Sequence, residues 1–162
     1  MNNTLVMYEE EFQAIKVLLN TLRMDASAKI VFLVDKNGQQ IADAGEVELI
    51  DTTSLASLTA GNVAATDGLA KLIGEKEFSI LFHEGRKDNI HISIVGQRLI
   101  LVVIFDERSS LGLVRLRVRK ASADIERVLN DMEAKAVEVG TVEAVSPFAE
   151  ITDDDIDALF SE

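Results

Sequence analysis

The segment 51–74 constrains the fold more than any other part of this chain, because it predicts one helix with two different apolar faces. Its sequence is DTTSLASLTAGNVAATDGLAKLIG. The first face recurs at helical spacing, with a gap near Asn62, and is the stripe we expect to pack into the core: Leu55, Leu58, Ala65, Leu69 and Leu72. The second face contains only small residues: Ser57, Ala60, Gly61, Ala64 and Gly68.

The small-residue face has no large side chain to bury, so it makes sense only where another backbone comes close. Glycine inside a helix costs about 0.5–1 kcal/mol relative to alanine. The two glycines therefore indicate a contact that compensates for this cost. We interpret the face as a partner-binding or dimer surface, and the alternative is a loosely packed helix within its own fold.

The length and composition predict one globular domain in a reducing compartment. A chain of 162 residues with 48% hydrophobic residues can bury one substantial core. It contains no cysteine, which excludes disulfides and thiolate metal sites and agrees with a cytoplasmic location. The first twelve residues, MNNTLVMYEEEF, lack the pattern of a signal peptide. The longest apolar run is Leu99–Phe105, far below the about 20 residues of a spanning helix, so we expect no membrane insertion.

The net charge of −12 is concentrated at the C-terminal end. From Val137 onward there are eight acidic residues and no lysine or arginine, which accounts for −8 and leaves −4 for residues 1–136. Nucleic-acid binding rests on cations that neutralise phosphates, so we expect no nucleic-acid partner. The acidic end would also be repelled by an anionic membrane surface.

Helical and β signals alternate along the first half of the chain. Glu9–Leu22 carries one apolar stripe and is expected to be a helix. Ala28–Val34 and Gln40–Ala44 are expected to be strands, joined by a hairpin turn at Asp35–Gly38 that contains Asn-Gly. Gly45–Ile50 then connects to the helix of segment 51–74, which we expect to be capped by Asp51 or Thr52 and to end at Gly74.

Three further strands and a long helix are expected after that. The strands are Phe78–Glu84, Ile90–Val95 and Arg98–Phe105, the last of which is apolar on both faces and therefore central in a sheet. Val114–Arg119 alternates like a strand, but apolar residues continue at helical spacing to Met132, so we favour a helix. The order predicts one five-stranded sheet with helices on its faces.

The strand Phe78–Glu84 is apolar enough to pair with a second copy of the chain if it lies at a sheet edge. An edge strand and a small-residue helix that both require a partner suggest a symmetric homodimer. We therefore predict a dimer interface at Phe78, Ile80 and Phe82.

The C-terminal end reads as a linker followed by a short helix. Residues 137–150 lack periodicity and contain the only proline, Pro147, and Thr152 is the expected cap of a helix that begins with three aspartates. So short a helix is not stable alone in water, so we expect it to fold on a partner. The apolar residues predicted to bind that partner are Phe148, Ile151, Ile156, Leu159 and Phe160. The alternative is a tail that only increases solubility.

Four stretches of the chain resemble the Roadblock family of dynein-light-chain-like domains. They are FLVDKNGQ at the hairpin, DTTSLASLTAGNVAA in the helix, VVIFDERSSLGLVRLRV at the last strand and helix, and SPFAEITDDDIDALFSE at the end. The resemblance implies an α/β fold of the α+β type, with a five-stranded antiparallel sheet and helices on both faces, as in Roadblock domains and profilins. It implies a Roadblock-like domain over residues 1–136 and a linker with a partner-binding helix over residues 137–162.

The resemblance also implies a function. It implies a homodimer whose sheets join through the third strand and whose second helices lie side by side across a bacterial Ras-like small GTPase. Such a dimer acts as a GTPase-activating protein that repositions the GTPase's own arginine and glutamine and supplies no arginine finger. Ala60 and Ala64 match the family's GTPase contact, with Gly61 and Gly68 nearby. The implied process is cell polarity and motility, with enrichment at a cell pole. The alternative is a scaffold of the same fold that binds a GTPase or a cytoskeletal protein without changing turnover.

Nothing in the sequence favours an enzyme with its own catalytic site. The glycine-rich phosphate loops and the G-x-S-x-G turn are missing from the sequence, and we expect neither a cofactor nor a metal site. We expect His83 and His91 at the surface or an interface. Asp153, Asp155 and Asp157 imitate the start of a calcium loop but lack its glycine and its glutamate. We interpret Arg98 and Arg108 as charged loop residues that increase solubility, and the alternative is that one of them acts as an arginine finger.

Overall fold

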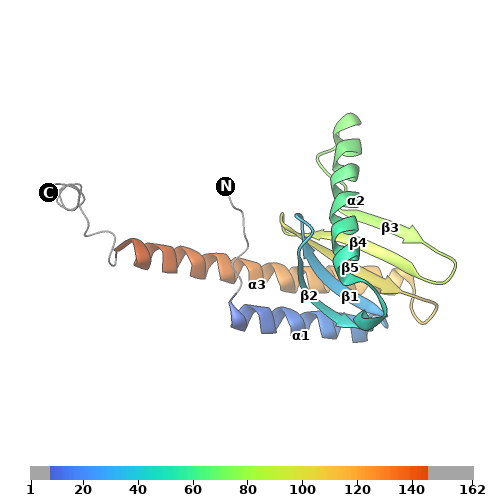
Figure 1. Cartoon of the computed structure of the whole chain (residues 1–162), viewed down its shortest axis with the longest axis horizontal. Helices are drawn as coiled ribbons and strands as arrows, with labels where there is room; N and C mark the ends of the chain where they lie inside the picture. Colours follow the sequence, from blue (N-terminus) through green and yellow to red (C-terminus); the bar gives the residue numbers. More distant parts are fainter. Residues whose placement is uncertain (1–7, 146–162) are drawn as a thin grey trace. The chain divides into compact units, whose positions relative to one another are not determined.

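The computed structural model describes residues 8–145, and the side chains of residues 8–137. The elements follow in the order α1 (Glu9–Asp25), β1 (Ile30–Asp35), β2 (Gln40–Gly45), a short 3-10 helix η1 (Val47–Leu49), α2 (Thr52–Leu72), β3 (Ile80–Glu84), β4 (Asn89–Val95), β5 (Leu99–Phe105) and α3 (Leu111–Val145) (Figure 1). Residues up to Val128 belong to one compact unit, and the chain from Leu129 onward belongs to a second. The predicted order of helices and strands is confirmed.

The five strands form one antiparallel sheet in the order β2-β1-β5-β4-β3. Its central strand is β5, in which every residue is buried, as the seven-residue apolar run predicted. Apolar residues on both faces of a strand require cover on both sides. The edges of the sheet are β2 and β3, so β3 has a strand neighbour on one side only within the described chain.

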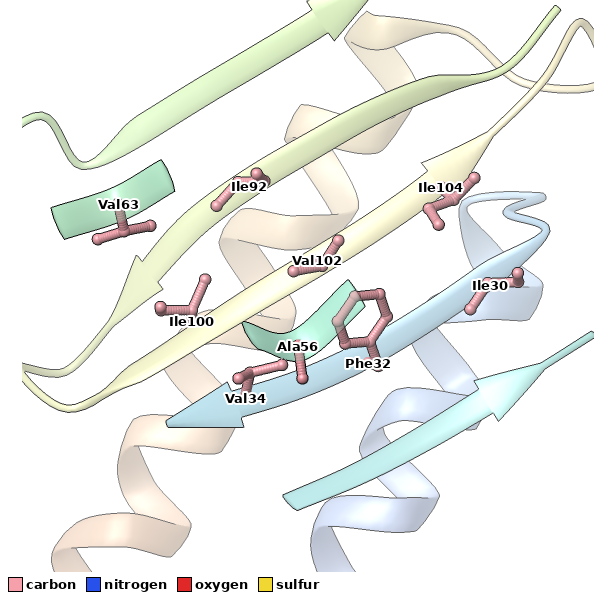
Figure 2. Packing of buried hydrophobic residues seen from close by; sticks show 9 residues of the cluster. All are labelled: Ile30, Phe32, Val34, Ala56, Val63, Ile92, Ile100, Val102 and Ile104. Carbon is pink, nitrogen blue, oxygen red and sulfur yellow. The ribbon is translucent and has the colours of Figure 1, made fainter. Parts of the chain in front are cut away.

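Helices cover both faces of the sheet, as expected. In Figure 2 the helix α2 lies in front of the sheet, and α1 and α3 pass behind it. Because successive side chains of a strand point to opposite faces, alternate residues of β1 and β5 meet α2. Together with Ile92 of β4 they form a cluster with two residues of α2: Ile30, Phe32, Val34, Ala56, Val63, Ile92, Ile100, Val102 and Ile104 (Figure 2).

The ends of α2 are defined by local hydrogen bonds that the sequence predicted. The side chain of Asp51 accepts a hydrogen bond from the backbone N–H of Ser54 at 3.1 Å and one from the Ser54 hydroxyl at 2.7 Å. At the other end Gly74 has φ +83°, and the N–H groups of Gly74 and Glu75 donate to Lys71 and Ala70. These two hydrogen bonds, together with the left-handed conformation of Gly74, end the helix.

The helix reading of Val114–Arg119 is confirmed, since these residues lie in α3. The linker reading of residues 137–150 is wrong for residues 137–145, whose backbone continues α3. Extending an existing helix costs far less than starting one, and no proline intervenes before Pro147. The predicted binding residues Phe148, Ile151, Ile156, Leu159 and Phe160 lie outside the described residues.

Among the helices that the structure describes, none combines the length and the apolar character needed to cross a bilayer.

We predict that the Asp51 carboxylate stabilises α2 in a pH-dependent way. The hydrogen bonds from the Ser54 side chain and backbone lower the pKa of Asp51 below its ordinary value of about 3.9. Because the pKa is lower in the folded state, the stabilisation is complete above the unfolded-state value and disappears as the pH falls through the folded-state value. Asp51→Ala should therefore lower the melting temperature at neutral pH, and the difference from the wild type should shrink in acid.

Thermal unfolding at about pH 7 and about pH 2.5 measures both effects. Asp51→Ser is the control, because serine keeps an acceptor for the helix N-terminus without the charge and should retain most of the stability at both pH values. An equal loss for Asp51→Ala at both pH values would contradict this role of the carboxylate.

Candidate partner-binding surface on α2 and β3

The face of α2 that packs on the sheet differs from the predicted leucine stripe. Leu58, Leu69 and Leu72 are 72%, 61% and 84% exposed. The buried residues are instead Ala56, Thr59, Ala60, Val63 and Ala70. The physical reason is volume: the sheet already presents large side chains such as Phe32 and Ile100 to α2, and close packing then requires small residues on the helix. Only Leu55 of the predicted stripe packs against this cluster.

The chain's own hairpin explains part of the small-residue stripe. Gly38, in the β1–β2 turn, has φ +89°, and a Cβ atom there would lie 3.3 Å from Cα of Ser57 and 3.6 Å from Cβ of Ala60. The backbone that closely approaches Ser57 and Ala60 is therefore this turn. Ala60 is only 8% exposed, so its assignment to a partner surface is corrected to a packing role.

The rest of the stripe is exposed, and its two glycines have open space around them. Gly61, Ala64 and Gly68 are exposed, as is the side chain of Ser57. No described atom outside the local helix lies within 4 Å of the position a Cβ atom would take at Gly61 or Gly68. We call Ser57, Gly61, Ala64 and Gly68 the small-residue side of α2.

The exposed leucines form a second free strip next to the small-residue side. Leu58, Ala65, Leu69 and Leu72 recur at helical spacing, and we call them the leucine side. Asn62 lies one turn after Leu58 and shows which flank of α2 this is. The Nδ2 atom of Asn62 is 3.3 Å from Nε2 of His83 in β3. The leucine side therefore lies on the flank of α2 toward the β3 edge, whereas Ala60 lies on the flank toward the β1–β2 hairpin.

The β3 edge is partly apolar and has one free side within the described chain. Ile80 is 50% exposed, and Phe78 and Phe82 are half-buried. The Phe82 ring stacks on Phe105 of β5, with the ring centroids 6.2 Å apart. The strand begins at Ile80, so Phe78 lies just before it and not within it.

The two histidines do not form a site together. In the β3–β4 register His83 lies opposite Ile90, so His83 and His91 point to opposite faces of the sheet. His83 is exposed, but His91 is 1% exposed, which corrects its expected surface placement. Among the described residues no group of histidines and carboxylates is arranged to hold a metal ion.

The loop arginine Arg108 is held by its own loop. Its Nε lies 2.9 Å from Oδ1 of Asp106, and its backbone N–H donates to the same oxygen. These hydrogen bonds lower the pKa of Asp106 and raise the pKa of Arg108. An arginine finger has to extend into a partner's site, and this pairing favours the simpler reading of Arg108 as a loop charge.

The fold is that of an α+β domain, and comparisons with known proteins place it in a family. Residues 15–105 match the Roadblock/LC7 domain. The chain belongs to the Roadblock/LC7 family. A comparison with curated protein sequences finds no significant match.

Solved structures refine the position of the chain within that family. Myxococcus xanthus MglB is 62% identical, with 79% of this chain and 96% of that chain covered and a TM-score of 0.75. The gliding protein MglB from Thermus thermophilus is 30% identical, with 81% and 99% covered and a TM-score of 0.74. An MglB described with a tetrameric arrangement is 28% identical, with 82% and 99% covered and a TM-score of 0.74.

The fold alone extends to more distant proteins. A profilin from Acanthamoeba castellanii is 10% identical, with 68% of this chain and 95% of that chain covered and a TM-score of 0.52. The expected Roadblock- and profilin-like fold class is therefore confirmed. The chain is an MglB-like member of its family.

We predict opposite effects of adding a methyl group at the glycines of this region. Gly61→Ala and Gly68→Ala should each raise the free energy of unfolding by about 0.5–1 kcal/mol, because alanine is the better helix former and the space is open. Gly38→Ala should lower it by about 1–2 kcal/mol, because its φ of +89° disfavours a side chain. Urea unfolding measures both, and a loss of stability at Gly61 and Gly68 would show that the small-residue side is packed.

Proposed function

We propose that the chain forms a symmetric homodimer through its β3 edges and the leucine sides of α2. Large apolar side chains rarely gather on a surface that stays uncovered. Leu58, Leu69 and Leu72 lie on the flank of α2 toward β3, the same edge that carries the half-exposed Ile80. A two-fold axis beside β3 would pair the two strands and bring the two leucine sides together. An MglB with a tetrameric arrangement supports self-association within the family.

In that dimer the two small-residue sides would remain free and adjacent, and we propose that they bind a Ras-like small GTPase similar to MglA. The exposed Gly61, Ala64 and Gly68 allow a partner's backbone to approach α2 closely. In the resemblance, Ala64 matches the family's GTPase contact, and Gly61 and Gly68 lie near it. The similarity to Myxococcus xanthus MglB supports an MglB-like regulator. The single observation that carries the proposal is the open small-residue side of α2.

In the proposed mechanism, this chain positions catalytic residues of the GTPase and contributes no catalytic group of its own. The small-residue side offers no charged group, and its only polar side chain is the Ser57 hydroxyl. Such a surface can fix the conformation of a GTPase loop that carries the GTPase's own arginine and glutamine. Catalysis of phosphoryl transfer depends mainly on positioning and electrostatic stabilisation, so holding those residues in place raises the rate. The chain then acts as a GTPase-activating protein without being an enzyme itself.

A scaffold that binds the same GTPase without changing its turnover is the second candidate function. The small-residue side serves both candidates equally, because both require only close contact. Single-turnover GTP hydrolysis with the isolated GTPase separates them, since a scaffold leaves the rate unchanged. Contact of the C-terminal segment with the GTPase, and enrichment at a cell pole, remain predictions from the resemblance.

We predict that Ala64→Arg weakens GTPase binding without unfolding the dimer. Ala64 is exposed, so arginine there blocks close approach but displaces no core atom. Binding should weaken by at least about tenfold, which corresponds to roughly 1.4 kcal/mol. Stimulated hydrolysis should fall with it, while the melting temperature stays within a few degrees of the wild type.

Asn20→Arg is the matched control, because it adds the same charge at an exposed position of α1. It should bind and stimulate normally. Ala60→Arg should instead unfold the protein, because Ala60 is packed beneath the hairpin. Normal binding by the Ala64→Arg dimer would contradict the proposed surface.

We predict that Arg108→Ala keeps most of the stimulated rate. An arginine finger contributes about 10³–10⁵-fold to GTP hydrolysis, so its loss would be unmistakable. Arg108 pairs with Asp106 in its own loop, and we expect less than about a tenfold change. Single-turnover hydrolysis at saturating protein measures this. A collapse of the rate with unchanged binding would show that the chain supplies an arginine.

A further inference from the structure

A cavity of about 400 Å³ lies on the face of the sheet opposite to α2. Its walls come from the β3 segment, from β4 and from the first turns of α3, all within the compact unit that ends at Val128. Ligand pockets in proteins commonly measure about 300–1,000 Å³, so this cavity has room for a small molecule. The proposed GTPase surface does not include it, and Ile80 is the residue that it shares with the proposed dimer edge.

Two polar side chains on its floor have no hydrogen-bond partner among the described residues. His91 is 1% exposed, and neither its Nδ1 nor its Nε2 has a partner. Ser93 is 5% exposed, and its Oγ is also without one. The two residues are two positions apart on β4, so both point to the same face. Each of these three atoms has less than 1 Å² of accessible surface, so they lie just beneath the cavity wall and do not face its open space.

Two arginines supply positive charge to the same cavity. Arg115 and Arg119 are four residues apart on α3, so they lie on one side of that helix. Neither forms an ion pair with another described residue, and no acidic residue is among those that line the cavity. Burial, and then the charge of Arg115, lower the pKa of His91. Both effects favour the neutral form of the imidazole.

The remaining walls of the cavity are partly apolar. Ile80 of β3 and Val118 of α3 also line it. A bare inorganic ion would leave these side chains without a contact. An occupant with a charged head and a short hydrocarbon stem satisfies both kinds of wall.

We propose that this cavity binds a small organic oxyanion, with a phosphate or carboxylate head between Arg115 and Arg119 and an apolar stem against Ile80 and Val118. Guanidinium groups bind such heads with paired, charge-assisted hydrogen bonds. The site lies on the other face of the sheet from the small-residue side and does not rest on the proposed GTPase function.

The chain contains only two histidines, and this makes a direct test possible. The full-length protein is labelled on its histidine rings and titrated with butyl phosphate while ring resonances are recorded. His91 should shift in a saturable way, and His83, exposed on the opposite face, should not. Butyrate tests the carboxylate head. Inorganic phosphate and butanol, which carry only the head or only the stem, should each bind at least about tenfold more weakly.

The variant Arg115→Gln/Arg119→Gln should weaken butyl phosphate binding by at least about tenfold without unfolding the protein, because both arginines are exposed at the rim. The control Arg86→Gln/Lys87→Gln removes the same charge from the exposed β3–β4 turn and should bind like the wild type. The proposal is overturned if neither butyl phosphate nor butyrate shifts His91, or if the arginine variant binds as tightly as the control. It is also overturned if no anion binds and the arginine variant changes the oligomeric state, because the cavity would then be a contact between copies.

Discussion

The packing of α2 on the central strands is the interaction on which the rest of the structure depends. Ala56 and Val63 meet Phe32, Ile100 and Val102 across a sheet face that is already filled with large side chains. The helix lies close because its inner residues are small. Because α2 packs so closely on the sheet, the Gly38 turn lies against Ser57 and Ala60, and Asn62 lies next to His83. These contacts fix the rotation of α2 about its axis, and that rotation decides which residues face outward.

Much of the fold could be predicted from local patterns. The Asn-Gly hairpin, the Asp51 cap, the Gly74 stop and the central β5 are each specified by residues close in sequence. The rotation of α2 could not be predicted in this way, because α2 is apolar on more than one side. Hydrophobicity favoured the leucines for the core, whereas the volume of side chains on strands far away in sequence selected Ala56, Thr59 and Val63. Leucines exposed in one copy are the pattern expected where a second copy supplies the cover.

The candidate site was predicted in outline and revised in detail. Gly61, Ala64 and Gly68 were identified because small residues at helical spacing need an explanation, and they are indeed open. Ala60 was included by the same reasoning but belongs to the hairpin contact. The His91 cavity could not have been inferred from the sequence, because it arises only where α3 passes over β4. The two faces of the sheet therefore differ in chemistry: the α2 face offers an uncharged surface that a partner can approach closely, and the opposite face offers the cationic side chains of Arg115 and Arg119.

The central claim is that the leucine side of α2 faces a second copy while the small-residue side stays free. Because the chain has no cysteine, single cysteines can be placed without interference. The decisive measurement is oxidative crosslinking of Leu58→Cys, Ala65→Cys and Leu69→Cys against Ser57→Cys, Ala64→Cys and Gly68→Cys. We expect covalent dimers from at least one member of the first set and from none of the second. Crosslinking confined to the second set, or absent from both, would contradict this arrangement of the helix.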